Sequence, residues 1–218
     1  MFPINGIQGM LSLLDMYSGD AEKQQECMNN IRQSSEYLFE LVNNVLDMSM
    51  LESGEIELEH KPFNLQQLSE KVIALFEAQT KKKGVIISAD CLEAEHQDLI
   101  GSFVHLGQIG NNILDNAVKF TNRGGTVSIG YREISCDGNT AVIEFRCRDT
   151  GIGMSKEFLE KAFDAFAQED EKSARTSYQG TGLGLTLAKE LIEKMNGTIR
   201  IESEKAAEPV FTLHLALK

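Results

Sequence analysis

The sequence has no tryptophan, only three prolines and no apolar run long enough for a membrane span, which takes about 18 consecutive residues. It also lacks the pattern of a secretory signal peptide. We therefore expect a cytoplasmic chain without direct membrane contact of its own. The four cysteines, Cys27, Cys91, Cys136 and Cys147, are scattered and include no C-x-x-C pair. They are typical of ordinary thiols in a reducing compartment.

Basic residues are also scarce, because 21 lysines and arginines face 33 acidic residues and the net charge is −12. The longest basic run is Lys81–Lys83. Nucleic acids and anionic membranes require a basic face, so this charge pattern argues against both partners. With 42% hydrophobic and 25% charged residues, the 218-residue chain has the composition of a globular protein with a substantial core.

Residues 1–54 show only helical periodicity. The first helix has apolar residues at steps of three and four, and a second helix follows the loop at 18–20 with a heptad-like seam. The seam consists of Met28, Ile31, Ser35, Leu38, Val42, Val45 and Ser49. Two helices alone bury such a seam poorly, so we predict a homodimeric four-helix bundle. The alternative is a helical hairpin that lies on the following domain.

Gly54 ends the second helix, and residues 55–62 are charged, end in a proline and predict a linker or short strand. From residue 63 to 218 the pattern is mixed. Helices are expected over 65–78, 103–120 and 185–195, with a left-handed cap at Gly197. Strands are expected over 85–88, 127–131, 141–147, 199–201 and 211–217. This order predicts an α+β protein whose second domain is a two-layer sandwich.

Three polar residues, Asn112, Asn116 and Lys119, share one face of the helix expected over 103–120. A carboxamide oxygen is a suitable ligand for Mg²⁺ that bridges phosphates, and a lysine one turn later would neutralise phosphate charge. Phe120 follows directly. An ordinary solvated helix face explains such a stripe equally well when it is taken alone.

The strand expected over 141–147 runs on into Asp149, which is followed by Thr150-Gly151-Ile152-Gly153. A carboxylate here could accept a hydrogen bond from the amino group of adenine, and the glycines let the backbone pass close to the base. A plain turn would have the same sequence.

A second glycine segment, Gly180-Thr181-Gly182-Leu183-Gly184, precedes the helix expected over 185–195. Its backbone amides at a helix N-terminus predict a phosphate site. It is neither a G-x-x-x-x-G-K-[ST] loop nor a G-x-G-x-x-G fingerprint. The segment between the two glycine segments is long and polar, which predicts a lid that closes over the ligand. Arg175, near its end, is the cation expected to reach a terminal phosphate.

In this order the motifs resemble the dimerisation and ATP-binding region of sensor histidine kinases of the hybrid type. The asparagine box matches 112–121, the glycine boxes match 149–153 and 180–184, and the phenylalanine box matches 163–166. The resemblance implies a Bergerat fold, ATP and Mg²⁺ as cofactors, and a response-regulator receiver domain as partner.

The same resemblance implies roles for individual residues. Asn116 would contact magnesium with support from Asn112, and Asp149 would recognise adenine. Asn112, Lys119 and Arg175 would take part in phosphoryl transfer. The expected nucleotide contacts also include Phe120, Gly151, Ile152, Gly153, Gly180, Thr181, Gly182, Leu183 and Gly184.

Two departures from the family pattern stand out. Pro3 resembles the proline that follows the phosphorylated histidine, so the sequence is expected to begin after that histidine. None of His60, His96, His105 and His214 has the acceptor context, so we expect no autophosphorylation. The last glycine box is replaced by the sequence at 206–211, which bears on affinity for ATP.

Two other functions remain open. ATPases of the same fold place a glutamate four residues before the metal-binding asparagine. Here that position is Asn112, which is no general base at neutral pH. The other alternative is a degenerate nucleotide-binding module whose helices serve only for interaction.

Overall fold

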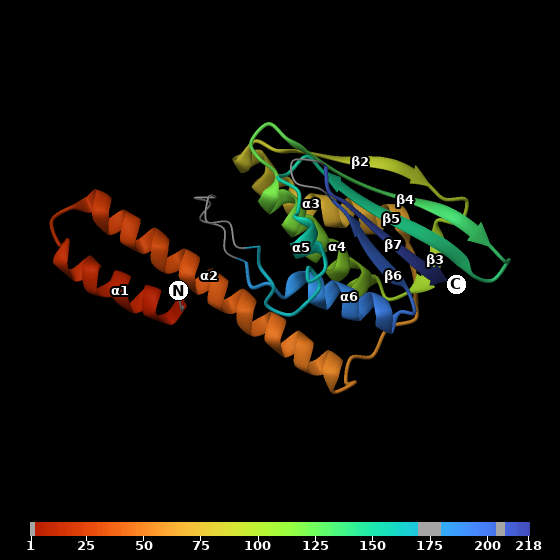
Figure 1. Cartoon of the computed structure of the whole chain (residues 1–218), viewed down its shortest axis with the longest axis horizontal. Helices are drawn as coiled ribbons and strands as arrows, with labels where there is room; N and C mark the ends of the chain where they lie inside the picture. The colour runs from red at the N-terminus through yellow and green to blue at the C-terminus, as the bar shows by residue number, and fades with distance from the viewer. Residues whose placement is uncertain (1–2, 170–179, 204–207) are drawn as a thin grey trace.

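The computed structural model describes residues 3–169, 180–203 and 208–218. A helical hairpin is followed by an α/β unit, and the end of the hairpin that carries its turn extends away from that unit (Figure 1). The helices are α1 (Pro3–Met16), α2 (Ala21–Glu52), α3 (Leu65–Lys83), α4 (Phe103–Phe120), α5 (Lys156–Leu159) and α6 (Gly184–Lys194). The strands are β1 (Lys61–Asn64), β2 (Ile86–Glu93), β3 (Asp98–Gly101), β4 (Thr126–Cys136), β5 (Ala141–Asp149), β6 (Thr198–Glu202) and β7 (Val210–Leu217).

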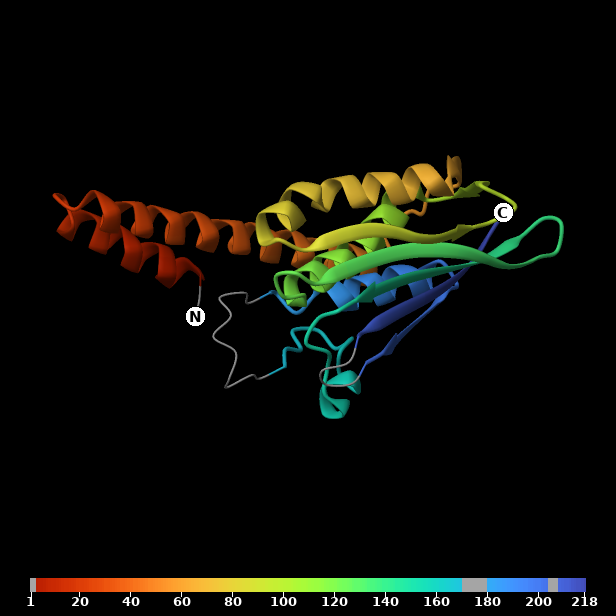
Figure 2. The same cartoon turned by 90° about the horizontal axis from the view of Figure 1, so that it is seen from above.

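Five strands form the main sheet in the order β2-β4-β5-β7-β6. The β2–β4 pair is parallel, and the other three pairs are antiparallel. The strands β1 and β3 make a separate antiparallel ribbon. Figure 2 shows α3, α4 and α6 together on one face of the sheet, so the unit has two layers. The two-layer α+β sandwich predicted from the sequence is confirmed.

The core lies between the sheet and these helices. Its fully buried side chains include Leu65, Leu114, Val118, Ile143, Leu191, Ile192, Phe211 and Leu215. They come from α3, α4, α6, β5 and β7 in alternating or helical spacing, as the sequence pattern requires. The opposite face of the sheet exposes Arg132, Arg146 and Arg148 instead. One face is therefore the core and the other remains open.

The hairpin buries little by itself. Helix α1 has no fully buried residue, and Cys27 is the one such residue of α2. Asp20 caps α2 by accepting a hydrogen bond from the Lys23 amide at 3.1 Å. The exposed apolar residues of the hairpin include Ile4, Leu11, Met28, Phe39, Val42, Val45, Leu46 and Met50. Of the predicted seam, Ile31 and Leu38 are half-buried, whereas Met28, Val42 and Val45 are exposed.

Several sequence predictions about element boundaries need correction. Helix α3 continues five residues beyond the predicted end, to Lys83, and stops at Gly84 with φ +73°. The left-handed residue after α6 is Asn196 (φ 56°), one position before the predicted Gly197. Gly197 is required for another reason, because a Cβ there would overlap Leu215. Strand β1 begins at Lys61, within the segment for which the sequence predicted a linker or a short strand.

The described helices include none that is both long and apolar enough to cross a membrane.

Candidate functional site

Helix α4 positions the polar stripe. Its buried face packs into the core through Leu106, Ile109, Ile113, Leu114, Ala117 and Val118. The side chains of Asn112, Asn116 and Lys119 lie at the margin of that face and are half-buried. Asn116 Nδ2 donates to the Asn112 carbonyl at 2.9 Å. That bond uses the amide nitrogen within the helix, so Oδ1 is the Asn116 atom left to bind a metal.

The second glycine segment lies directly against this stripe. A Cβ on Gly184 would lie 3.7 Å from Asn112 Oδ1 and 3.8 Å from Asn116 Nδ2. A Cβ on Gly180 would overlap Lys119 Nζ. These two contacts bring the predicted metal ligands and the predicted phosphate loop into one place. Only glycine fits at position 180 without displacing the lysine.

Gly182 is constrained by its conformation as well as by space. Its φ is +73°, and a Cβ would lie 2.8 Å from the Phe166 carbonyl carbon. The Phe166 amide donates to the Gly182 carbonyl at 3.0 Å. Gln168 Nε2 also donates to the Gly180 carbonyl at 2.6 Å. The described part of the predicted lid is therefore hydrogen-bonded to the second glycine segment.

Helix α6 starts at Gly184, and no side chain caps its N-terminus. The first backbone N–H groups of a helix lack partners within the helix and favour anions. Thr186 Oγ1 in the first turn is buried and has no hydrogen-bond partner among the described residues. Asn112 Nδ2 on α4 is in the same situation. Buried polar atoms of this kind are unfavourable without a ligand.

The first glycine segment lies at the other end of the stripe. Asp149 ends β5 and is 3% exposed. Its Oδ1 accepts a hydrogen bond from the Gly151 amide at 2.8 Å. A Cβ on Gly151 would lie 2.8 Å from the Phe120 carbonyl oxygen, at the end of α4. Gly153 adopts φ +68°.

Burial raises the pKa of Asp149 to about 6, although the hydrogen bond from the Gly151 amide favours the carboxylate. Thr121 beside it is fully buried, and its hydroxyl donates to the Ala117 carbonyl at 2.7 Å. A buried, weakly solvated carboxylate at a strand end is suited to accept one hydrogen bond from a base.

Lys119 lies beside two carboxylates. Burial lowers its pKa, whereas Asp115 on the same helix and Glu40 on α2 oppose that change. Its Nζ lies 5.4 Å from the centre of the Phe120 ring. Lys119 is thus a partly desolvated cation next to the glycine segment, which strengthens its interaction with an anion.

Helix α2 contributes contacts that sequence reasoning missed. Asn44 Nδ2 donates to Thr181 Oγ1 at 3.0 Å, and Gln108 Nε2 donates to Asp47 Oδ2 at 2.7 Å. The Thr181 hydroxyl also hydrogen-bonds the Glu40 carboxylate. These residues follow the polar side of a helix whose apolar seam carried the sequence signal. No local motif marks them, because their partners lie more than 60 residues away.

The remaining predicted residues differ in their placement. Leu183 is buried, Ile152 is half-buried and Phe120 is 40% exposed. Arg175 falls outside the described residues, and so does part of the altered last glycine box. The predicted lid shows one short helix, α5, in its described part.

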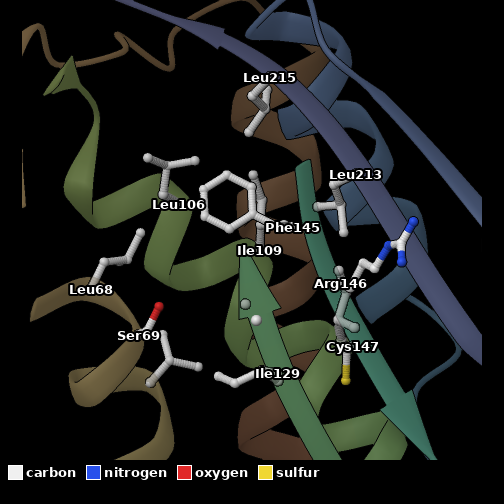
Figure 3. A pocket seen from close by; sticks show the side chains of 14 residues that line it. Leu68, Ser69, Leu106, Ile109, Ile129, Phe145, Arg146, Cys147, Leu213 and Leu215 are labelled. Carbon is white, nitrogen blue, oxygen red and sulfur yellow. The ribbon is translucent and has the colours of Figure 1, made fainter. Parts of the chain in front are cut away.

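A cavity between α3, α4 and the sheet is separate from this site. It is lined mostly by apolar side chains such as Leu68, Leu106, Ile109, Phe145 and Leu213 (Figure 3). It is part of the interior of the two-layer core and contains none of the asparagine or glycine motifs.

Comparisons with known proteins match both the helical hairpin and the α/β unit to known families. Residues 101–218 match the family described as histidine kinase-, DNA gyrase B-, and HSP90-like ATPase. Residues 3–54 match the His Kinase A (phospho-acceptor) domain. The chain therefore belongs to this ATPase family. Within the family it is of the sensor histidine kinase type, because the N-terminal match accompanies the ATPase match.

Named relatives agree with this assignment. The chain is 35% identical over 216 residues to sensory/regulatory protein RpfC of Xanthomonas campestris. The aligned region covers 99% of this chain and 29% of that protein. It is 32% identical over 213 residues to hybrid signal transduction histidine kinase B of Dictyostelium discoideum, with coverage of 96% and 10%. The chain thus spans less than a third of these relatives.

Among solved structures, full-length ShkA in complex with AMPPNP superposes with a TM-score of 0.74 at 28% identity. The match covers 99% of this chain and 43% of that one.

Proposed function

We propose that this chain is the catalytic region of a hybrid sensor histidine kinase, which binds ATP with Mg²⁺ and transfers the γ-phosphate to a histidine. The observation that carries the proposal is the convergence of both glycine segments on α4. Gly184 lies against Asn112 and Asn116, Gly180 lies against Lys119, and Gly151 lies against the end of α4. A similar chain, ShkA, has been solved with the ATP analogue AMPPNP.

The residues divide the work by their chemistry. Asp149 accepts a hydrogen bond from the amino group of adenine. The N-terminus of α6 and Lys119 together balance the negative charge of the phosphates. Asn116, with Asn112 beside it, holds the metal through carboxamide oxygens. A Mg²⁺ ion held by these residues would supply positive charge that stabilises the charge developing on the phosphates during transfer. Arg175 is assigned to the terminal phosphate on the resemblance alone.

The fit of this ligand rests on the unpaired atoms. Asn112 Nδ2 and Thr186 Oγ1 are buried without partners in the described part of the chain, and both belong to elements that border the glycine segment. A polar ligand at this point would supply hydrogen-bond partners for both atoms.

None of the four histidines of this sequence is assigned as the acceptor. Three of the four histidines of this chain are engaged elsewhere, His96 with Glu133, His105 with Ser102 and His214 with Glu144. The phosphoryl group then passes to the aspartate of a response-regulator receiver domain. The exposed apolar residues on α1 and α2 support a homodimer through these helices.

The experiment mixes this chain with a separate histidine-bearing dimerisation domain, Mg²⁺ and γ-labelled ATP. We expect acid-labile label on the added domain and none on this chain. Asn116→Ala should reduce the transfer rate at least 100-fold, an estimate typical of losing one group that stabilises transferring charge. Asn139→Ala, in the exposed β4–β5 turn, is the matched control and should transfer at the parental rate.

Three results would oppose the proposal. Transfer by Asn116→Ala at the parental rate would remove the metal assignment. Rapid ATP hydrolysis without transfer would favour the ATPase alternative. A chain that shows no Mg²⁺-dependent binding of an ATP analogue in calorimetry would be a degenerate interaction module.

A further inference from the structure

Three side chains of types that can bind metals lie together at the end of the sheet opposite the proposed nucleotide site. They are His96, in the connection between β2 and β3, and Glu133 and Cys136, near the end of β4. One ligand atom from each lies within 4.8 Å of the other two. Asp149 pairs with Val127 near the start of β4, nine residues before Cys136. At the rise of a β-strand this separation is about 30 Å.

An irregularity in β4 creates this arrangement. Residues three apart in a regular strand point to opposite faces of the sheet, so Glu133 and Cys136 should diverge. The pairing with β5 shifts between Glu133 and Ser135, whose partners are the consecutive residues Ile143 and Val142. Ile134 is thus one extra residue, a β-bulge, and it returns Cys136 to the face of Glu133. Bulges often re-aim side chains in this manner at functional positions.

Glu133 is held in place by the segment that carries His96. The His96 backbone N–H donates to Glu133 Oε2 at 3.0 Å. The other carboxylate oxygen, Oε1, lies 3.0 Å from His96 Nδ1. Adjacent ligand atoms of a tetrahedral zinc ion are roughly 3.3 Å apart for nitrogen and oxygen, from the usual bond lengths. One oxygen is therefore fixed by the backbone, and the other faces the imidazole at nearly the spacing of two ligands.

A hydrogen-bonded histidine–glutamate pair accounts for two of these residues without a metal. It gives no role to the third, the thiol of Cys136, which the bulge brings to the same point. Cys136 is exposed and free, so an ion could reach it from solvent. The combination of nitrogen, oxygen and sulfur donors also excludes Mg²⁺ and Ca²⁺ as the preferred ions, because both select oxygen.

We propose that His96, Glu133 and Cys136 form a site for a divalent transition metal, with Zn²⁺ as the ion that best matches the donors, and with water completing the coordination. Three protein ligands with water in the fourth position also occur in catalytic zinc sites. Occupancy would link the β2–β3 connection to the end of β4. The site is independent of ATP binding, so it can be tested whether or not the kinase proposal holds.

The test uses the whole 218-residue chain after treatment with a chelator and a reductant. Co²⁺ is titrated first, because a cobalt–thiolate bond produces a near-ultraviolet charge-transfer band. Zn²⁺ affinity is then measured by competition with a chromophoric chelator. We expect one Zn²⁺ per chain, and Zn²⁺ should abolish the cobalt band. Cys136→Ser should lose the band, and both it and His96→Ala should weaken Zn²⁺ binding at least tenfold.

Matched controls separate this site from general thiol or imidazole binding. Cys91→Ser changes the other exposed cysteine, and His60→Ala changes a histidine outside the cluster. Both should retain the band and the affinity. The proposal is overturned if the parent binds no Zn²⁺ more tightly than the Cys136→Ser variant, or if Cys91→Ser alone removes the band. Thermal unfolding without metal should be the same for all variants, which confirms that each one folds.

Discussion

At the scale of single residues, the site depends on groups that are costly to bury. Asp149, Lys119 and the orphan atoms of Asn112 and Thr186 are all partly or fully removed from water. The sequence identified Asp149, Asn112 and Lys119 because each belongs to a motif. It gave no sign of Thr186, since a threonine in the first turn of an amphipathic helix is unremarkable until its surroundings are known.

The raised pKa of Asp149, about 6, predicts a pH-dependent affinity for the nucleotide. A protonated carboxyl group accepts a hydrogen bond from the adenine amino group less well than a carboxylate does. We therefore expect the dissociation constant of an ATP analogue to increase as the pH falls below about 6, approaching tenfold per pH unit. Calorimetry between pH 5 and 8 would measure it.

The Asp149→Asn variant is the matched control, because it keeps the shape but cannot titrate. It should bind more weakly and lose the part of the pH dependence that belongs to Asp149, while the titration of the nucleotide itself remains. Identical pH profiles for the two proteins would exclude the role of Asp149. The effect on stability has the opposite sign. The pKa of Asp149 is raised from 3.8 to about 6 on folding, so its contribution to the stability of the free chain is fully present below about pH 3.8 and is lost as the pH rises to about 6.

At the scale of elements, the spacing of apolar residues predicted those helices and strands that bury one face in the core. Helix α4 matches its predicted limits of 103–120 because an amphipathic helix of this length has an unambiguous spacing. The ribbon of β1 and β3 was not predicted, since each strand has only four residues. Their pairing is set by contacts 34 or more residues apart in sequence. The length of α3 was underestimated because its last turn is three lysines without an apolar signal.

The glycine segment before α6 yields a prediction at this scale. Gly182→Ala should destabilise the fold by about 1–2 kcal/mol from the left-handed backbone alone. The new Cβ would also press on Phe166 and Ala167, which come within 3 Å of it. We expect weaker nucleotide binding together with a lower midpoint in urea unfolding. Gly19→Ala is the control, since nothing lies within 4 Å of its added Cβ, and its stability should match the parent within about 0.5 kcal/mol.

At the scale of the whole molecule, the hairpin leaves several large apolar side chains exposed. Phe39 is 71% exposed and Leu46 is 56% exposed. The polar side of α2 meets the catalytic unit through Asn44 and Asp47. The apolar side therefore remains exposed in the single chain, and the homodimer that the heptad pattern predicts stays a prediction.

Disrupting that surface should alter the oligomeric state. Val42→Glu introduces a charge on the apolar side of α2, where the valine is 48% exposed in the single chain. We expect sedimentation analysis to show a dimer for the parent and a monomer for the variant, because a buried unpaired carboxylate opposes association. Asn43→Glu adds the same charge one position away and should remain dimeric. A parent chain that is monomeric at all accessible concentrations would contradict the dimer proposal.

The bond between Asn44 and Thr181 has a mechanical consequence. Helix α2 is continuous from Ala21 to Glu52, so it behaves as a rod with the apolar stripe and this bond on different sides. Each residue of a helix advances about 100° around the axis. Rolling the rod through one such step would carry Asn44 away from Thr181 and Asp47 away from Gln108. Torque applied to the far end of the rod would thus change the contacts that α2 makes with the glycine segment and with α4.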